Sequence, residues 1–334
     1  MEKNPIAITG TSKISDDKNI QEVIKDQITS GIANASDKKH TESILHLEGE
    51  RAKSEKEIKR IEAVETYLGR LFDKLGLPHE GRFIEQDQIH FLSQEVFEKN
   101  FSQFTCDVGG FFRAGDRVIF MNDNNMPEGA DPADKEITDL EHLTHECIHL
   151  ASHAKTLANI GEDKSVSYGN YRTGYRVLGL DSNDSKFNGF NEGVVCATER
   201  LMLLSEVEDL KKRFHATEPQ LEKLGYGAYV SNQVLVHTLN HKIAEFRKEK
   251  PVTSLTRIIR SQFTGEMMHL RDIEDIYGKD SLDLLAKFQS SSDSKINEVR
   301  DPLILKYFQS EDSGERIEIK EEIEKFEKTV NPTQ

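Results

Sequence analysis

The residues of this sequence best suited to chemistry form a short HExxH segment, His145-Glu-Cys-Ile-His149. On a helix, positions four residues apart share one face, so both imidazoles could bind one metal ion. Zn²⁺ accepts histidine nitrogens at about 2.0–2.1 Å in a tetrahedral site that keeps one position for water. Glu146 could take a proton from this water, because the ion lowers the pKa of the water to about 7. The segment predicts metal-assisted hydrolysis, with His145 and His149 as zinc ligands and Glu146 as general base.

A zinc site of this kind needs a third protein ligand, and three options can be weighed. The longer motif HExxHxxGxxH fails, because its glycine is Ser152 and its last histidine is Lys155. A cysteine ligand, as in peptide deformylases, would be Cys106, but the segment TCDVGG does not resemble theirs. A glutamate on a following helix would be Glu192, 43 residues after His149. Glu192 is the strongest candidate and is the predicted third ligand.

Two segments together resemble the gluzincin clan of zinc metallopeptidases: HECIH, and GFNEGVVCATE further along the chain. The resemblance covers roughly residues 84–205. It implies a zincin-like fold, with a small sheet and two helices that carry the ligands. One edge strand of this sheet, in VGGFF or RVIFM, would bind an extended substrate as an added strand. Thermolysin-like members have aspartate four residues after the third ligand, where this chain has Cys196, and Glu199 lies one turn further along the helix.

Peptidases of this kind often use a tyrosine or histidine to stabilise the oxyanion. The resemblance makes Tyr175, in TGYRV between the two ligand helices, the predicted residue. Other candidates are Tyr168, Tyr171, Tyr226, Tyr229, His237 and His241. His142 and His153 continue the stripe formed by His145 and His149 on the expected helix. We interpret these two as solvated or capped side chains rather than ligands.

The elements that must position these residues can be predicted from periodicity and capping signals. Apolar residues near a 3.6-residue spacing predict a helix over about 41–76, with Gly76 as its cap. A strand is expected at 89–92, a helical turn at 93–101, and a hairpin of VGGFF and RVIFM around Ala114-Gly115-Asp116. The helix that carries HExxH should begin at Asp131-Pro132 or at the capping box from Thr138, and run toward Gly161.

The second half of the chain is expected to be mainly helical. SYGNYRTGYRVLGLD predicts a strand or hairpin, and NGFNEGVVCATERLMLLSEV predicts a helix that begins near Asn188 or Asn191. The predicted class is therefore α+β. The expected organisation is a flexible N-terminus over 1–40, a helical segment over 41–80, a zincin-like catalytic core over 81–205 and a mostly helical region over 206–334.

Composition limits the classes of function and partner. The net charge of -15 disfavours nucleic-acid binding, which needs a basic footprint. The chain has three cysteines, no apolar signal segment at its start and no apolar run of 18 residues, so we expect no membrane span and a cytoplasmic protein. The acidic C-terminal run is typical of a solvated helix, and it also resembles the tails of bacterial effectors exported without a cleavable signal. That would place the enzyme in a host cytosol.

The predicted function is that of a zinc-dependent endopeptidase that hydrolyses peptide bonds of a protein or peptide substrate, which in a host cell would be a host protein. Two alternatives stay open from the sequence. One is a catalytically silent binding module on a zincin scaffold, against which the intact Glu146 argues. The other is a zinc hydrolase that acts on small amides or esters.

Overall fold

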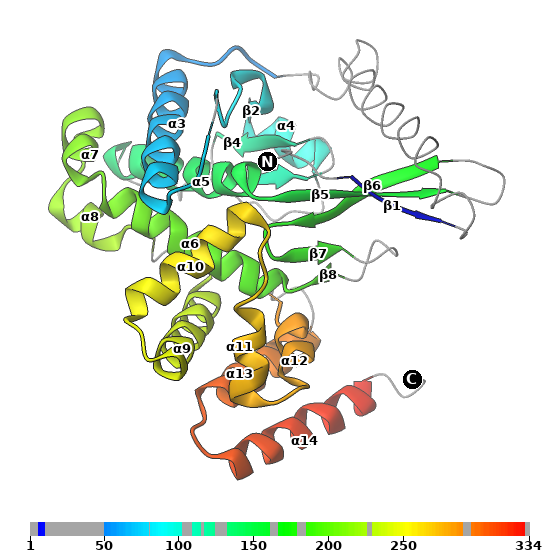
Figure 1. Cartoon of the computed structure of the whole chain (residues 1–334). Coiled ribbons are helices and arrows are strands. Elements are labelled where there is room, and N and C mark those ends of the chain that lie inside the picture. The colour runs from blue at the N-terminus through cyan, green and yellow to red at the C-terminus, as the bar shows by residue number, and fades with distance from the viewer. Residues whose placement is uncertain are drawn as a thin grey trace. The chain divides into compact units, whose positions relative to one another are not determined.

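The computed structural model describes residues 6–10, 50–79, 81–101, 109–114, 117–123, 132–160, 166–178, 185–225, 229–289 and 295–330. The protein is mostly helical with small sheets, which confirms the α+β class (Figure 1). The chain divides into two compact units. The first holds Met1–Thr173 and Ser205–Glu222, and the second holds Gly174–Leu204 and Lys223–Gln334.

The first long helix of the first unit, α3 (Glu55–Leu75), is fixed at both ends by its own sequence. Ser54 and Glu57 form a capping box at its start, and Gly76 ends it in the left-handed conformation with φ 63°. The cap at Gly76 confirms the prediction. The predicted start near residue 41 is wrong, because residues 50–54 are not helical and the capping box sets the start at Glu55.

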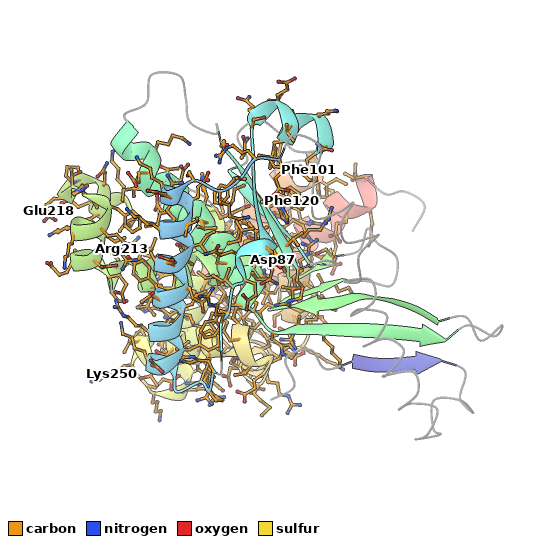
Figure 2. The ribbon with its side chains drawn as sticks, turned by 90° about the horizontal axis from the view of Figure 1, so that it is seen from above. Asp87, Phe101, Phe120, Arg213, Glu218 and Lys250 are labelled. Carbon is orange, nitrogen blue, oxygen red and sulfur yellow. The ribbon has the colours of Figure 1, made fainter. Side chains whose placement is uncertain are left out.

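A three-stranded sheet contains the predicted hairpin. β3 (Gly110–Arg113) pairs antiparallel with β4 (Val118–Asn122), with Phe111 opposite Phe120. β2 (Ile89–Leu92), the predicted strand, pairs parallel with β4, so β4 is the central strand and β3 lies at an edge. The 3-10 helix Gln86–Gln88 precedes β2, and α4 (Gln94–Asn100) follows it. The rings of Phe101 and Phe120 pack 4.9 Å apart in the core of this sheet (Figure 2).

The helix that carries the HExxH segment, α5 (Pro132–Ala151), lies beside α3 (Figure 1) and contacts β3 and β4. It begins at the predicted proline. The prediction that it continues toward Gly161 is wrong, because its last carbonyl groups already have partners. Ser152 donates through Oγ to Ile148 O at 2.6 Å and through N–H to His149 O at 3.2 Å, and the Arg117 guanidinium donates to Leu150 O. A cation at this end also suits the helix dipole.

The chain leaves α5 directly into a sheet. β5 (Ala154–Ile160) pairs antiparallel with β6 (Val166–Thr173) and parallel with β1 (Ile6–Gly10). Residues 6–10 were predicted to belong to a flexible N-terminus, and they form a strand instead. The first unit is completed by α7 (Val207–Phe214) and α8 (Glu218–Lys223), and the Tyr67 hydroxyl of α3 donates to Asp209 at 2.7 Å. The run IQEVIKDQI at 20–28, whose sequence also suggests a short helix, lies outside the described residues.

The second unit packs a set of helices around one apolar core. Two short strands, β7 (Arg176–Leu178) and β8 (Ser185–Lys186), pair antiparallel and lead into α6 (Asn188–Leu204). The remaining helices are α9 (Val230–Arg247), α10 (Pro251–Thr264), α11 (Leu270–Tyr277), α12 (Ser281–Lys287), α13 (Lys295–Gln309) and α14 (Ser313–Val330). Phe190, Val194, Leu239, Ile258 and Phe308 are among the buried residues of this core. Of the helices in the described residues, none combines the length and apolar character needed to cross a membrane.

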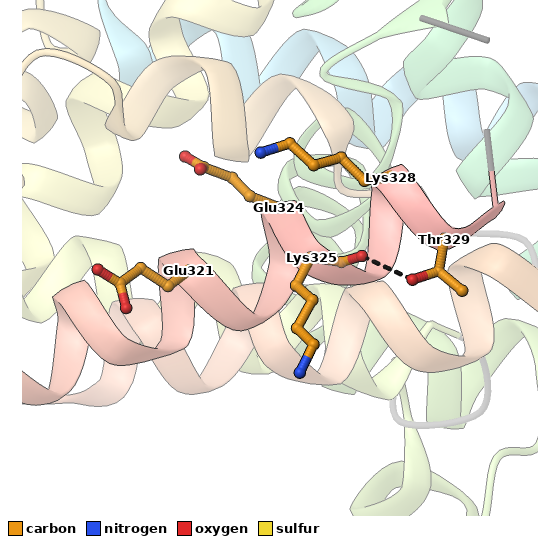
Figure 3. Close-up of a pocket in the computed structure, with 5 residues that line it drawn as sticks. All are labelled: Glu321, Glu324, Lys325, Lys328 and Thr329. Atoms are coloured by element: carbon orange, nitrogen blue, oxygen red, sulfur yellow. Dashed lines mark hydrogen bonds between the residues drawn. The ribbon is translucent and has the colours of Figure 1, made fainter. Parts of the chain in front are cut away.

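The acidic C-terminal run forms α14, the charged helix that was predicted. Ile319 and Ile323 bury one face of it in the core. Figure 3 shows charged side chains of both signs along the helix surface, with Thr329 Oγ1 donating to the carbonyl oxygen of Lys325 at 2.9 Å. This part of α14 is therefore a polar helix surface.

Candidate metal centre

The two histidines of the HExxH segment present their ring nitrogens to each other. They lie one turn apart on α5, and the Nε2 atoms are 3.3 Å apart. Each residue is only 8% exposed. Two nitrogens that bind one tetrahedral ion at 2.0–2.1 Å lie about 3.3–3.4 Å apart. The donor type and the separation of the two nitrogens therefore fit zinc.

The remaining faces of α5 explain why the pair is held in place. Leu143, Cys147 and Ile148 are fully buried, so the helix is packed on the sides that do not carry the histidines. Burial raises the pKa of the Cys147 thiol well above its usual value, and the side chain behaves as part of the core. Glu146, between the two histidines in sequence, is only half-buried. Its carboxylate belongs to the same rigid helix and is more accessible than either imidazole.

The two flanking histidines are in different environments. His142 lies on α5, and its burial, together with the neighbouring His145, lowers its pKa to about 4 despite the opposing effect of Asp139. It is therefore neutral at pH 7. His153 lies beyond the end of α5, so the predicted helical stripe stops at His149. Partial burial and the charge of Arg172 lower the pKa of His153.

The edge strand β3 lies next to the second histidine. The ring of Phe112 is nearly parallel to that of His149, with 4° between the planes and 6.4 Å between centroids. The residues of β3 are all half-buried, in contrast to the fully buried β4. Within the described residues β3 is an edge strand of its sheet, and an extended peptide can add to such an edge.

In the second unit, α6 carries three further donor side chains on one face. Glu192, Cys196 and Glu199 follow one another at spacings of four and three residues, and they are 8%, 3% and 6% exposed. Buried carboxylates are rare unless they are paired or bind a metal. Because α6 begins at Asn188, Glu192 lies just after the first turn, three positions further into the helix than a start at Asn191 would place it.

The neighbours of Glu192 have structural roles of their own. Asn191 Oδ1 accepts hydrogen bonds from the backbone N–H of Tyr175 at 2.9 Å and from Gln262 Nε2 at 3.2 Å. At Gly193, a Cβ atom would lie 2.4 Å from the carbonyl oxygen of Asn232 in α9, so only glycine allows this close packing of helices. The Asn-Glu-Gly sequence thus combines two packing residues with one buried carboxylate.

Buried histidine, glutamate and cysteine side chains of the described residues form two groups that could hold a metal ion. One group is His145, His149 and Glu192, the predicted ligand set, and the other is His145, Cys196 and Glu199. His145 belongs to both groups. The second group was not predicted from the sequence, although the i, i+4, i+7 spacing along α6 contained the signal for it.

Tyr175, the predicted oxyanion residue, is fully buried in the core of the second unit. Its hydroxyl donates to the carbonyl oxygen of Ile258 at 2.9 Å and lies 2.6 Å from His269 Nε2. These contacts favour a packing role. The oxyanion role stays a prediction. Of the other candidates, Tyr226 lies outside the described residues, and His237 and His241 are exposed on α9.

The chain was also compared with protein-family models, curated proteins and solved structures. No family model, no curated protein and no solved structure matches it.

Proposed function

We propose that the protein is a zinc-dependent endopeptidase of gluzincin type. The single observation that carries this proposal is the 3.3 Å separation of the Nε2 atoms of His145 and His149 within an HExxH helix. Two buried imidazoles at this distance form half of a tetrahedral zinc site. Glu146, on the same helix and more accessible, supplies the carboxylate that such chemistry needs.

In this proposal, His145, His149 and Glu192 hold the ion. Glu192 has the support of its burial on α6 and of its place in the first donor group. A bound Zn²⁺ would lower the pKa of water and polarise the substrate carbonyl group. Glu146 accepts the proton from the attacking water and passes it to the leaving amine, which is general base and then general acid catalysis. His142 is neutral at pH 7 and adds no positive charge beside the ligands.

The substrate in this proposal is an extended peptide that pairs with the edge of β3. Phe112 on this strand packs against the His149 ring, so a peptide added to β3 passes close to the ligand histidine. Backbone hydrogen bonds would hold the peptide in register. A peptide whose amide nitrogens are methylated at alternate positions cannot form this ladder and should be cleaved more slowly than its unmodified counterpart.

The deciding experiment combines metal analysis with an assay of casein cleavage on the full chain. We expect one zinc per chain and cleavage that a chelator abolishes. Glu146→Gln should retain zinc and lose about 10²–10⁴-fold in rate, because the proton acceptor is removed while the ligands stay. Glu136→Gln, on the same helix and away from the histidines, is the matched control and should keep full activity. Retained cleavage in Glu146→Gln would exclude this mechanism, and a chain that neither binds zinc nor cleaves protein would exclude the function.

A further inference from the structure

The second unit contains a cavity that the proposed peptidase chemistry does not use. It has a volume of about 560 Å³ and lies between α6, α9 and α10. Its walls are mainly aliphatic, with Leu201 and Leu204 from α6, Val230 and Val234 from α9, and Leu255 from α10. The volume lies within the range of about 300–1,000 Å³ that is usual for small-molecule sites.

The aliphatic residues at this cavity are exposed to an unusual degree. Leu201, Leu204 and Val230 are 42%, 43% and 62% exposed. Large apolar side chains gathered around a hollow gain most from a ligand that removes their surface from water. The cavity is thus suited to an apolar molecule.

The lining also includes the polar residues Arg200, Gln233, His237 and Asn240, and one of them carries an orphaned buried atom. Asn240, on α9, lines the cavity and is only 4% exposed. Its Oδ1 atom is buried and has no hydrogen-bond partner among the described residues. A buried carbonyl oxygen without a donor costs about 1–3 kcal/mol, so such atoms are rare unless something supplies the donor.

We propose that this cavity binds a small, mainly apolar molecule that carries one hydroxyl or N–H group, whose hydrogen bond Asn240 Oδ1 accepts. The aliphatic walls supply most of the binding free energy, and the amide supplies the orientation. The site is separate from the proposed chemistry. On α6 the cavity is lined by Ala197, Arg200, Leu201 and Leu204, and none of these belongs to the Glu192, Cys196 and Glu199 series.

The test compares two probes that differ only in the hydrogen-bond donor. These are 2-naphthylmethanol and its methyl ether, titrated into the full chain with ¹³C-labelled leucine and valine methyl groups. We expect saturable shifts of the methyl signals of Leu201, Leu204 and Val234 with the alcohol. The ether should bind at least about five-fold more weakly, because it leaves Asn240 Oδ1 without a donor. Equal affinities, or no saturable shifts with the alcohol, would overturn the proposal.

Two variants test the position of the site. Asn240→Leu removes the acceptor and should abolish the preference for the alcohol over the ether. Val234→Trp, at a position 36% exposed, should block the cavity and prevent binding of both probes while the fold is kept. Val252→Trp is the matched control on the exposed surface of α10, outside the cavity, and should bind both probes as the unmodified chain does. Unchanged binding in Val234→Trp would place the probes elsewhere and refute the site.

Discussion

The Nε2 atoms of His145 and His149 lie 3.3 Å apart on one face of α5, and both side chains are buried. Without an ion, one N–H···N hydrogen bond can bridge this gap. With an ion, the same separation lets both lone pairs point at one metal without a change in the helix. The helix itself therefore holds the pair at a separation suited to metal binding.

Removal of either histidine should weaken zinc binding strongly. We expect His145→Ala and His149→Ala to raise the dissociation constant for zinc by more than about 100-fold, since even residues that only support the ligands cost 10–100-fold. Competition with a chromophoric chelator measures this directly. His241→Ala is the control, because it disrupts an exposed pair of histidines on α9 whose ring centroids are 4.4 Å apart. Loss of zinc in His241→Ala, with retention in His149→Ala, would mean that the metal binds on α9.

The two donor groups make different predictions for α6. If Glu192 is the third ligand, Glu192→Ala should lower zinc affinity by more than about 100-fold, whereas Cys196→Ser should change it by about threefold or less. Glu199→Ala should have an intermediate effect, typical of a residue that supports the ligands. The same chelator competition measures all three variants, with circular dichroism to check the fold. The opposite order, with Cys196→Ser or Glu199→Ala as the severe change, would favour the group of His145, Cys196 and Glu199.

Local signals in the sequence were sufficient for α5 and for two elements near it, α3 and the β3–β4 hairpin. The cap at Gly76, the β3–β4 hairpin and the start of α5 at Pro132 depend on neighbouring residues, and all were predicted. The end of α5 was not. The segment 154–160 is a strand because it pairs with β6 and with residues 6–10, which are about 150 positions away in the chain. The pairing with residues 6–10 is remote in sequence, and no local pattern contains it.

The same distinction applies to the candidate site. The HExxH spacing is local, and the facing imidazoles could be predicted from the geometry of a helix. The environment of Tyr175 could not, because its partners Ile258 and His269 are 83 and 94 residues away. The role proposed for Asn240 could not be predicted from the sequence for a similar reason. Whether its Oδ1 atom has a hydrogen-bond partner depends on the packing of the residues around it.

The start of α3 should give the first unit a measurable pH dependence. Burial alone would raise the pKa of Glu57, but its bonds with Arg51, at 2.6 and 2.9 Å, and with Ser54 outweigh this and lower it. A carboxyl group with a lower pKa in the folded state adds stability above its unfolded pKa of about 4.3, and this stability is lost as the pH falls through the folded pKa. Glu57→Gln should therefore cost about 1 kcal/mol at pH 7 and progressively less in acid.

Urea-induced unfolding at pH 7 and at several lower pH values measures this difference. Glu62→Gln, an exposed position on the same helix, is the matched control and should change the free energy of unfolding by less than about 0.5 kcal/mol. A loss in Glu57→Gln that stayed constant across this pH range would show that the charge of Glu57 does not contribute, and that the capping geometry alone accounts for the effect.

The role of Tyr175 can be decided by removing only its hydroxyl. In Tyr175→Phe, the carbonyl oxygen of Ile258 and the ring nitrogen of His269 lose a buried partner, so we expect a loss of about 1–3 kcal/mol in the free energy of unfolding. Zinc content and cleavage rate at a temperature where the variant is folded should stay within about twofold. Tyr277→Phe is the matched control, because that buried hydroxyl also donates to a backbone carbonyl, Phe308 O, at 2.7 Å. Both variants should lose stability. If Tyr175 stabilises the oxyanion, kcat should instead fall by about 10²–10³-fold in Tyr175→Phe and stay unchanged in Tyr277→Phe. That result would support a catalytic role for Tyr175.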